Sequence, residues 1–194
     1  MEREQEVALV QQLRAGDVRA FDAIYDAYNL RLFNFLLRMT RNRSAAEDLL
    51  EETWLRLVSN GKTLAPDTRL GPWLFTVARN LFLSDYRSRS REQAEARDWI
   101  SLCQSGAPSS PLDLAVVDEL EQRLETALME LPPKYREVLL LVGYEGLRPL
   151  DAALVCGVSP EALRQRLSRA RALLAQRLKD QELPSGILSN EVIQ

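Results

Sequence analysis

Apolar residues recur at helical spacing along nearly the whole chain, and no run alternates apolar and polar residues for long enough to suggest a sheet. The clearest stripe lies between residues 17 and 40, where apolar and aromatic side chains return every three or four positions. Its members are Phe21, Ile24, Tyr25, Tyr28, Leu32, Phe35, Leu36 and Met39. Because this spacing gathers side chains on one helical face, the sequence predicts an all-α protein.

Four helices are expected in the first half of the chain. The first covers about residues 4–15 and ends at Gly16, and Asp17 is suited to cap the second helix. Residues 44–47, Ser-Ala-Ala-Glu, have the spacing of a capping box and predict a third helix to about Ser59. After a loop over 62–71, a fourth helix begins near Pro72, with arginines collecting towards its end.

A linker is expected where this pattern fades. The apolar spacing weakens from about Ser88, and residues 105–111 are rich in Ser, Gly and Pro, which favour irregular backbone. Beyond it, the pattern predicts an acidic helix over 114–131, a break at the Pro132-Pro133 pair, a helix over 134–143, and two short helices around Gly157. The chain thus divides into two small helical domains, 1–92 and 113–180, joined by a flexible linker, 93–112, and followed by a tail, 181–194.

The chain of 194 residues contains no histidine, which removes Ser-His-Asp and Cys-His catalysis and every metal site that needs imidazole. Cys103 and Cys156 are the only cysteines, too few for a disulfide framework or a four-thiolate site. No cofactor and no metal are expected. Without a long apolar stretch, and with a charged first segment, the chain is expected to be cytoplasmic and without direct membrane insertion.

The net charge is only −3, but the charges are segregated along the chain. Residues 72–91 carry a local charge of +3 and residues 160–179 a local charge of +5, whereas residues 113–130 carry −5. Basic segments of this kind favour nucleic acid as a partner, although the whole molecule is not a polyanion binder.

Residues 150–171 have the pattern of a helix-turn-helix. Gly157 supplies the turn, Ser159 can cap the second helix, and Pro160 suits its first position. One face of that helix is apolar, and the opposite face presents Gln165 and Ser168 between Arg164 and Arg169. This arrangement suits a DNA recognition helix, and the alternative is an ordinary amphipathic helix with a solvated basic face.

In the third helix, the acids Glu47, Asp48, Glu51 and Glu52 form a ridge, hereafter the acidic ridge, over an apolar stripe. Solvated surface is the commonest explanation for acids in this pattern. Among the functional explanations, docking on a basic protein surface is the better one, and a catalytic pair of carboxylates is conceivable. The fourth helix interleaves aromatic and basic residues, a combination that can hold single-stranded nucleic acid. Trp73 by itself fits a core position better than a stacking platform.

These motifs together resemble the sigma-70 family of bacterial transcription initiation factors, specifically the small two-domain extracytoplasmic-function (ECF) group. Segments 13–17, 46–55 and 72–80 resemble region 2, and segment 131–140 with the helix-turn-helix resembles region 4. The resemblance covers almost the whole chain, and several ordered motifs are more specific than any single one.

The resemblance implies a role for each charged surface. Asp48, Glu51 and Glu52 would dock on the clamp helices of the polymerase β′ subunit. The loop over 62–70 and the fourth helix would recognise and help open the −10 element; the matching residues are Arg79, Asn80, Asp85 and Arg87. The last helix would recognise the −35 element; the matching residues are Arg164, Gln165, Ser168 and Arg169, with Arg166 and Arg171 better placed for phosphate.

Three departures from the family pattern are visible. Glu51 stands where glutamine is usual and makes the ridge more acidic, and Ala162 replaces a common threonine or valine. Residues 148–153, Arg-Pro-Leu-Asp-Ala-Ala, replace the usual Ser-Tyr-x-Glu-Ile-Ala, which affects where the helix-turn-helix begins.

The leading hypothesis is therefore an ECF-type sigma factor without a catalytic centre. It would bind core RNA polymerase through the β′ clamp helices and the β subunit, direct it to promoter DNA, and be held inactive by an anti-sigma factor. The alternative is an autonomous helix-turn-helix transcriptional regulator with a palindromic site. An enzyme is a distant third, since no nucleophile or phosphate loop is recognisable.

Overall fold

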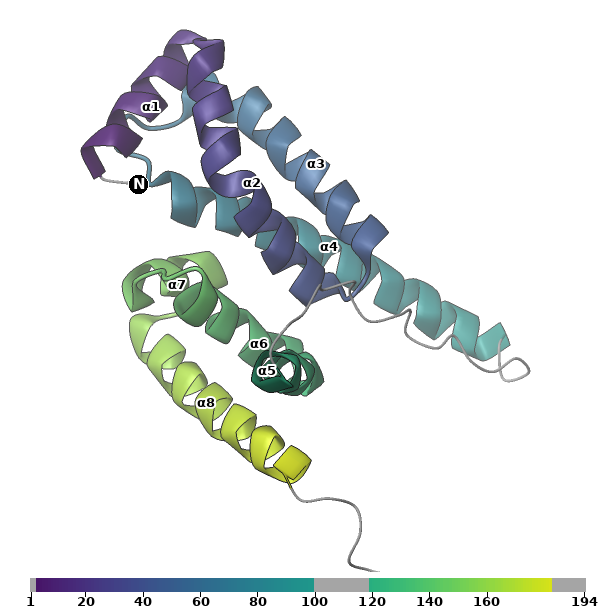
Figure 1. Ribbon diagram of the computed structural model, residues 1–194. Coiled ribbons are helices and arrows are strands. Elements are labelled where there is room, and N and C mark those ends of the chain that lie inside the picture. Colours follow the sequence, from purple (N-terminus) through teal and green to yellow (C-terminus); the bar gives the residue numbers. More distant parts are fainter. Residues whose placement is uncertain (1–2, 100–118, 183–194) are drawn as a thin grey trace, which may run out of the picture.

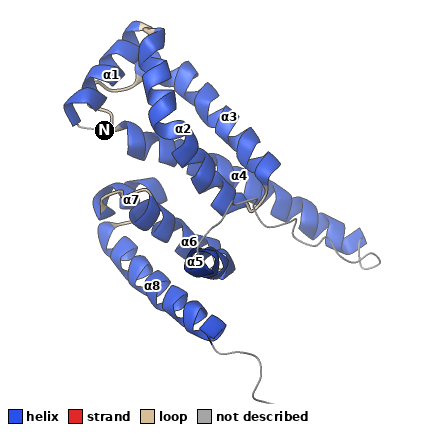
Figure 2. Ribbon diagram, in the orientation of Figure 1, coloured by secondary structure: helices blue, strands red, loops and turns tan. Residues whose placement is uncertain are grey.

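The computed structural model describes residues 3–99 and 119–182, and within these ranges every regular element is a helix (Figure 2). The elements are α1 (Arg3–Ala15), α2 (Val18–Thr40), α3 (Arg43–Asn60), the 3₁₀ turn η1 (Gly61–Thr63), α4 (Leu70–Trp99), α5 (Glu119–Glu130), α6 (Pro133–Leu139), the π-helical turn η2 (Leu140–Tyr144), α7 (Pro149–Cys156) and α8 (Pro160–Glu182). The all-α prediction is confirmed.

Helices α1–α4 form the amino-terminal domain, in which α2 packs against the other three. The stripe predicted on α2 is largely buried: Ile24, Leu32 and Leu36 have no exposed surface, and Phe35 meets Phe75 of α4 edge to face at 5.4 Å between ring centroids. Trp73 is partly buried against this core, as its helical spacing predicts. Burial of this apolar stripe is the main source of the domain's stability.

The beginnings of the helices follow the sequence signals in one case and depart from them in another. Asp17 caps α2, and its carboxylate accepts a hydrogen bond from the Arg19 amide at 2.9 Å. Asn42 caps α3 by accepting from the Ala45 amide at 3.0 Å, so the prediction of a capping box beginning at Ser44 is wrong. An asparagine two residues earlier is an equally good cap, and it lets the helix start at Arg43.

Helix α4 is longer than its apolar pattern indicates. It starts at Leu70, before Pro72, and continues to Trp99, well past Ser88 and into the first part of the range expected to be linker. Residues 91–98 consist of Arg, Glu, Gln, Ala and Asp, most of which favour a helix without an apolar face. The rest of the expected linker, including Cys103, lies outside the described residues, as do 114–118 and the tail from 183.

Helices α5–α8 form the carboxyl-terminal domain. Pro133 opens α6 at a first-turn position, where the missing N–H costs nothing. Gly157 ends α7 with φ +63°, a left-handed conformation that glycine adopts without strain, and its N–H bonds back to the carbonyls of Ala153 and Leu154. The helix after this turn was expected to be short, which is wrong, because α8 has 23 residues.

The two domains lie against each other, with α4 packed on α7 and α2 on α6 (Figure 1). Segments far apart in sequence are therefore neighbours, and several charged side chains of one domain meet partners in the other. In the part of the chain that the structure describes, no helix has the length and apolarity to cross a membrane.

Candidate functional site

The acidic ridge lies on the outer face of α3 over a packed base. Asp48 and Glu51 are exposed, while Glu52 is half-buried and accepts a hydrogen bond from Arg56 at 2.8 Å. Beneath them Trp54 is buried, and its indole N–H donates to the Asn29 side chain at 3.0 Å. The ridge is therefore fixed in position by the core.

Two large apolar side chains stand exposed on the same helix as the ridge. Leu55 is 52% exposed and Val58 is 61% exposed. Neither residue was predicted to be exposed, because their spacing gives no sign of which way they face. Exposed apolar groups beside acids are typical of a protein-docking surface, since the acids set orientation and the apolar groups supply buried area.

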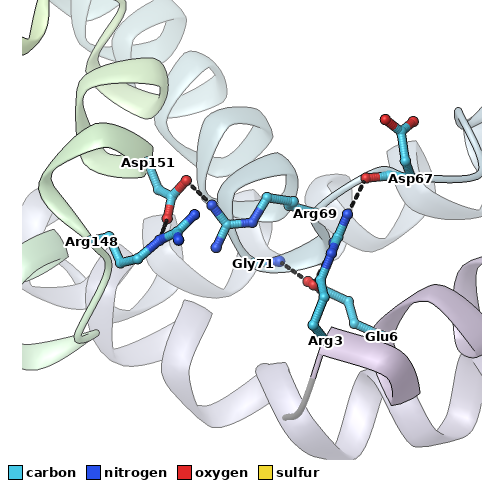
Figure 3. Close-up of polar contacts among 7 residues, drawn as sticks. All are labelled: Arg3, Glu6, Asp67, Arg69, Gly71, Arg148 and Asp151. Atoms are coloured by element: carbon cyan, nitrogen blue, oxygen red, sulfur yellow. Dashed lines mark hydrogen bonds and ion pairs between the residues drawn. The ribbon is translucent and has the colours of Figure 1, made fainter.

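The loop before α4 is held by the first helix of the chain. Arg3 of α1 donates from Nη2 to the carbonyl oxygen of Asp67 at 2.7 Å and pairs with Glu6 at 2.9 Å. The other carboxylate oxygen of Glu6 accepts from the Gly71 amide at 3.4 Å (Figure 3). Glu6 is buried, although its position in a charged first segment gave no signal of this. The loop is thus anchored near its carboxyl end.

The four α4 residues matched to −10 recognition do not share one environment. Asn80 and Arg87 are exposed. Arg79 is half-buried, with 15% of its side chain exposed, and its Nε pairs with the Glu137 carboxylate of α6. Asp85 lines a cleft of about 410 Å³ at the domain boundary, together with Phe82 and Tyr86. Two of the four residues therefore face the other domain.

Arg69, at the end of the loop, also meets the carboxyl-terminal domain. Its Nη1 pairs with one carboxylate oxygen of Asp151 on α7, and the other oxygen accepts from Arg148 at 2.9 Å. Figure 3 shows Asp151 held between the two arginines. Asp151 is only 3% exposed and occupies the position where the family pattern has glutamate. This departure thus preserves a carboxylate.

Helix α8 has the two-sided arrangement expected of a recognition helix. Leu163, Leu167 and Ala170 are buried against the domain. The other side exposes the residues matched to −35 recognition: Arg164, Gln165, Ser168, Arg169 and Arg171. Arg166 is the exception, since only 24% of its side chain is exposed.

The start of α8 is capped as the sequence predicts. The Ser159 hydroxyl accepts from the Ala162 amide at 3.1 Å, and Pro160 is the first helical residue. Arg164 pairs with Glu161 at 2.5 Å, a contact near the beginning of the helix that a DNA phosphate could displace. The cap, the turn glycine and the exposed face are therefore all present.

Glu137 connects the two candidate DNA-binding helices. One carboxylate oxygen pairs with Arg79 of α4, and the other lies 3.9 Å from Nη1 of Arg166 on α8. Nearby, burial raises the pKa of Cys156 to about 12, and the negative charge of Glu137 contributes to the rise. The thiol is therefore protonated at neutral pH. Within the described ranges, no three His, Cys, Asp or Glu side chains are grouped to hold a metal ion.

Comparisons with protein families match both halves of the chain. Residues 24–92 match the family described as Sigma-70 region 2, and residues 121–174 match the family described as Sigma-70, region 4. The first match includes α3 and most of α4, and the second includes the helix-turn-helix.

Individual relatives extend over most of the chain. The ECF RNA polymerase sigma factor EcfG of Rhodopseudomonas palustris is 38% identical over 141 residues, which cover 73% of this chain and 75% of that protein. The RNA polymerase sigma factor CarQ of Myxococcus xanthus is 32% identical and covers 90% of this chain and 98% of its own length.

One solved structure is similar across both domains. The sigma factor RpoE of Bartonella quintana, in complex with the anti-sigma factor NepR, has a TM-score of 0.68 and 29% sequence identity. The match covers 82% of this chain and 96% of that one.

Proposed function

The chain belongs to the ECF group of the sigma-70 family, and from this premise we propose that it binds core RNA polymerase and directs it to specific promoters to initiate transcription. Sigma factors of this family have no catalytic centre of their own, and the polymerase carries out the chemistry. The activity proposed for this chain is therefore to bind the polymerase and to position it on promoter DNA.

One observation carries the proposal: the acidic and the basic exposed surfaces lie on different domains of one chain. The ridge of α3 exposes Asp48 and Glu51 in the amino-terminal domain, whereas α8 exposes Arg164 and Arg169 in the carboxyl-terminal domain. An autonomous DNA-binding regulator needs the second surface but has no evident use for the first. A factor that joins a polymerase to a promoter needs both.

The residue assignments follow that division. Asp48, Glu51 and Glu52 would contact the β′ clamp helices, and exposed Leu55 and Val58 would add buried area. Asn80 and Arg87, joined by Arg79 and Asp85, would contact the −10 element, and the exposed residues of α8 would contact the −35 element. A further contact of the carboxyl-terminal domain with the β subunit completes the proposed assembly.

We also propose that an anti-sigma factor holds the chain inactive. The similar RpoE chain was solved with the anti-sigma factor NepR, and the match extends over nearly all of that chain. In such an arrangement the cytoplasm is the site of action, since polymerase and promoters are there.

The experiment that tests the function is the affinity of the fluorescently labelled full chain for core RNA polymerase, measured by anisotropy at a fixed salt concentration. Nanomolar binding, with weak binding of the free chain to duplex DNA, is the expected result. Absence of polymerase binding together with tight binding to duplex DNA would instead favour the autonomous regulator.

A further inference from the structure

Glu161 is the one acid in the basic stretch of α8. Between residues 160 and 179 the chain has five arginines and one lysine, and Glu161 is the single negative charge among them. An acid in this stretch opposes the attraction of the helix to the phosphate backbone, an attraction that does not depend on base sequence. Glu161 therefore acts against general DNA affinity, and its position in the helix determines what it can do instead.

Glu161 lies in the middle of the exposed face of α8. Gln165 and Ser168 follow it at spacings of four and seven residues, which places the three side chains in one row along the helix. All three are exposed, whereas Leu163 and Leu167 are buried on the opposite side. A helix anchored by its buried side presents such a row to the floor of the major groove.

Glu161 also stands at the end of α8 that contacts bases in a helix-turn-helix. In this motif the amino-terminal residues of the second helix contact base edges. Ser159 caps α8 and Pro160 is its first residue, so Glu161 belongs to the first turn. The Glu161 side chain is 63% exposed. Since phosphates repel a carboxylate, a base edge is the part of the duplex that Glu161 is placed to contact.

Arg164 holds the carboxylate of Glu161 in place. Its Nη2 donates to one oxygen of Glu161 at 2.5 Å, across one turn of the helix. This bond uses one of the two carboxylate oxygens, and the other can accept from a base. The guanidinium group has five N–H donors, so it can compensate the charge of Glu161 and still donate to DNA. The pair is therefore able to enter the groove together.

The chemistry of a carboxylate selects the base that it can contact. An ionised carboxylate only accepts hydrogen bonds, so it requires an amino group on the base edge. In the major groove guanine presents two acceptors, and thymine presents one acceptor and a methyl group. Adenine presents an amino group beside the N7 acceptor, whereas cytosine presents an amino group without a neighbouring acceptor. Cytosine is therefore the base that suits Glu161 best.

We propose that Glu161 sets a base preference of α8 by accepting a hydrogen bond from the N4 amino group of a cytosine, and that its negative charge rejects the other bases at that position. The inference rests on the proposed contact of α8 with the −35 element and adds a residue outside the set matched to that element. A carboxylate that meets no amino group would lie unpaired in a groove lined by phosphates. The loss of general affinity thus becomes selectivity.

The test is a selection of duplexes with a randomised −35 region by the full chain bound to core polymerase, followed by sequencing. Wild type should enrich C·G at one position by at least about fivefold over the other base pairs, the lower end of the weight of one good base contact. Glu161→Gln should change the preference at that position towards A·T, because a carboxamide matches N6 and N7 of adenine. Preferences at the other positions should stay the same.

Asp180→Asn is the matched control, because it also removes one exposed acid from α8. Asp180 lies about five helical turns from Glu161, so its substitution should leave every preference unchanged. A duplex with another base pair at the selected position separates base contact from helix stability. Glu161→Gln should bind this duplex at least as tightly as wild type. If Glu161 only stabilised the start of α8, its replacement would weaken binding to every duplex alike.

Absence of a selected C·G pair in wild type, or an unchanged preference in Glu161→Gln, would overturn the proposal. Equal weakening on all duplexes would also overturn it, as would the same change of preference in Asp180→Asn. Repeating the selection with the full chain alone at low salt keeps the proposed function separate. If the chain does not bind polymerase but its own selection changes from C·G to A·T, the proposed function is overturned and the role of Glu161 stands.

Discussion

Arg136 of α6 donates a hydrogen bond from Nη1 to the backbone carbonyl oxygen of Arg38, at 2.9 Å, near the end of α2. Its other nitrogens reach the end of α5, where the carbonyls of Leu128, Met129 and Leu131 accept at 3.2, 2.7 and 3.0 Å. One buried side chain thus satisfies carbonyl groups at the carboxyl ends of two helices, one from each domain.

Replacing Arg136 by methionine should lower the free energy of unfolding by about 3 kcal/mol, because several buried carbonyl groups lose their donors. Burial and the nearby Arg41 cation lower the pKa of Arg136 to about 10, so the side chain is still charged at neutral pH. Urea denaturation followed by circular dichroism measures the loss. Arg177→Met, at an exposed arginine, should change stability by less than about 0.5 kcal/mol. Equal effects of the two substitutions would contradict this role of Arg136.

Charge reversal of the acidic ridge should weaken polymerase binding without unfolding the chain. Asp48→Arg and Glu52→Arg replace attraction to a basic partner surface with repulsion, and each should cost tenfold or more in affinity, or about 1.4 kcal/mol. Anisotropy with core polymerase provides the measurement, and Asp180→Arg, at another exposed acid, is the control. Wild-type affinity in the double reversal would exclude the ridge as the docking surface.

Alanine at Arg164 or Arg169 should reduce selectivity for the −35 element more than it reduces polymerase binding. Loss of a bidentate base contact costs about 1–3 kcal/mol against the preferred base pair, whereas loss of a phosphate contact at Arg171 weakens all sequences alike. Competition between a duplex selected by the wild-type holoenzyme and a scrambled duplex distinguishes these effects. Arg177→Ala, farther along α8, should leave the ratio unchanged. A uniform loss in Arg164→Ala would assign that residue to phosphate instead.

Gly157 should be intolerant of a side chain for backbone reasons alone. A Cβ atom there would meet nothing within 4 Å, yet the residue has φ +63°, so Gly157→Ala should cost about 1 kcal/mol. A Cβ at Gly143 would also meet nothing, and φ there is not positive, so Gly143→Ala should be neutral or stabilising. Thermal denaturation of both variants makes the comparison. Equal stability of the two would show that the turn does not need glycine.

Cys156 should react slowly with thiol reagents. Burial raises its pKa from an ordinary 9.0 to about 12, which lowers the thiolate fraction at pH 8 by about a thousandfold. In a Cys103→Ser chain, the absorbance change with a disulfide reagent follows this thiol alone. The rate should rise sharply on unfolding in urea. A native rate equal to that of a small free thiol would contradict the burial.

The helices themselves were predictable because their signals are local. The stripe on α2, the cap at Asp17 and the turn at Gly157 depend on neighbours within a few residues, and all three are present in the structure. The misjudged boundaries have local causes as well. Asn42 competes with Ser44 as a cap, and residues 91–98 form helix without an apolar face to announce it.

The sequence by itself determined an all-helical chain with a helix-turn-helix, an acidic ridge and segregated charge, since periodicity, caps and charge runs are properties of adjacent residues. Only the tertiary structure decided that Arg79 meets Glu137, 58 positions away, and that Arg69 meets Asp151, 82 positions away. The physical reason is that an arginine's sequence neighbours specify its helix and its face, whereas its partner depends on how two separate domains pack. The charges were visible in the sequence, and their pairing was not.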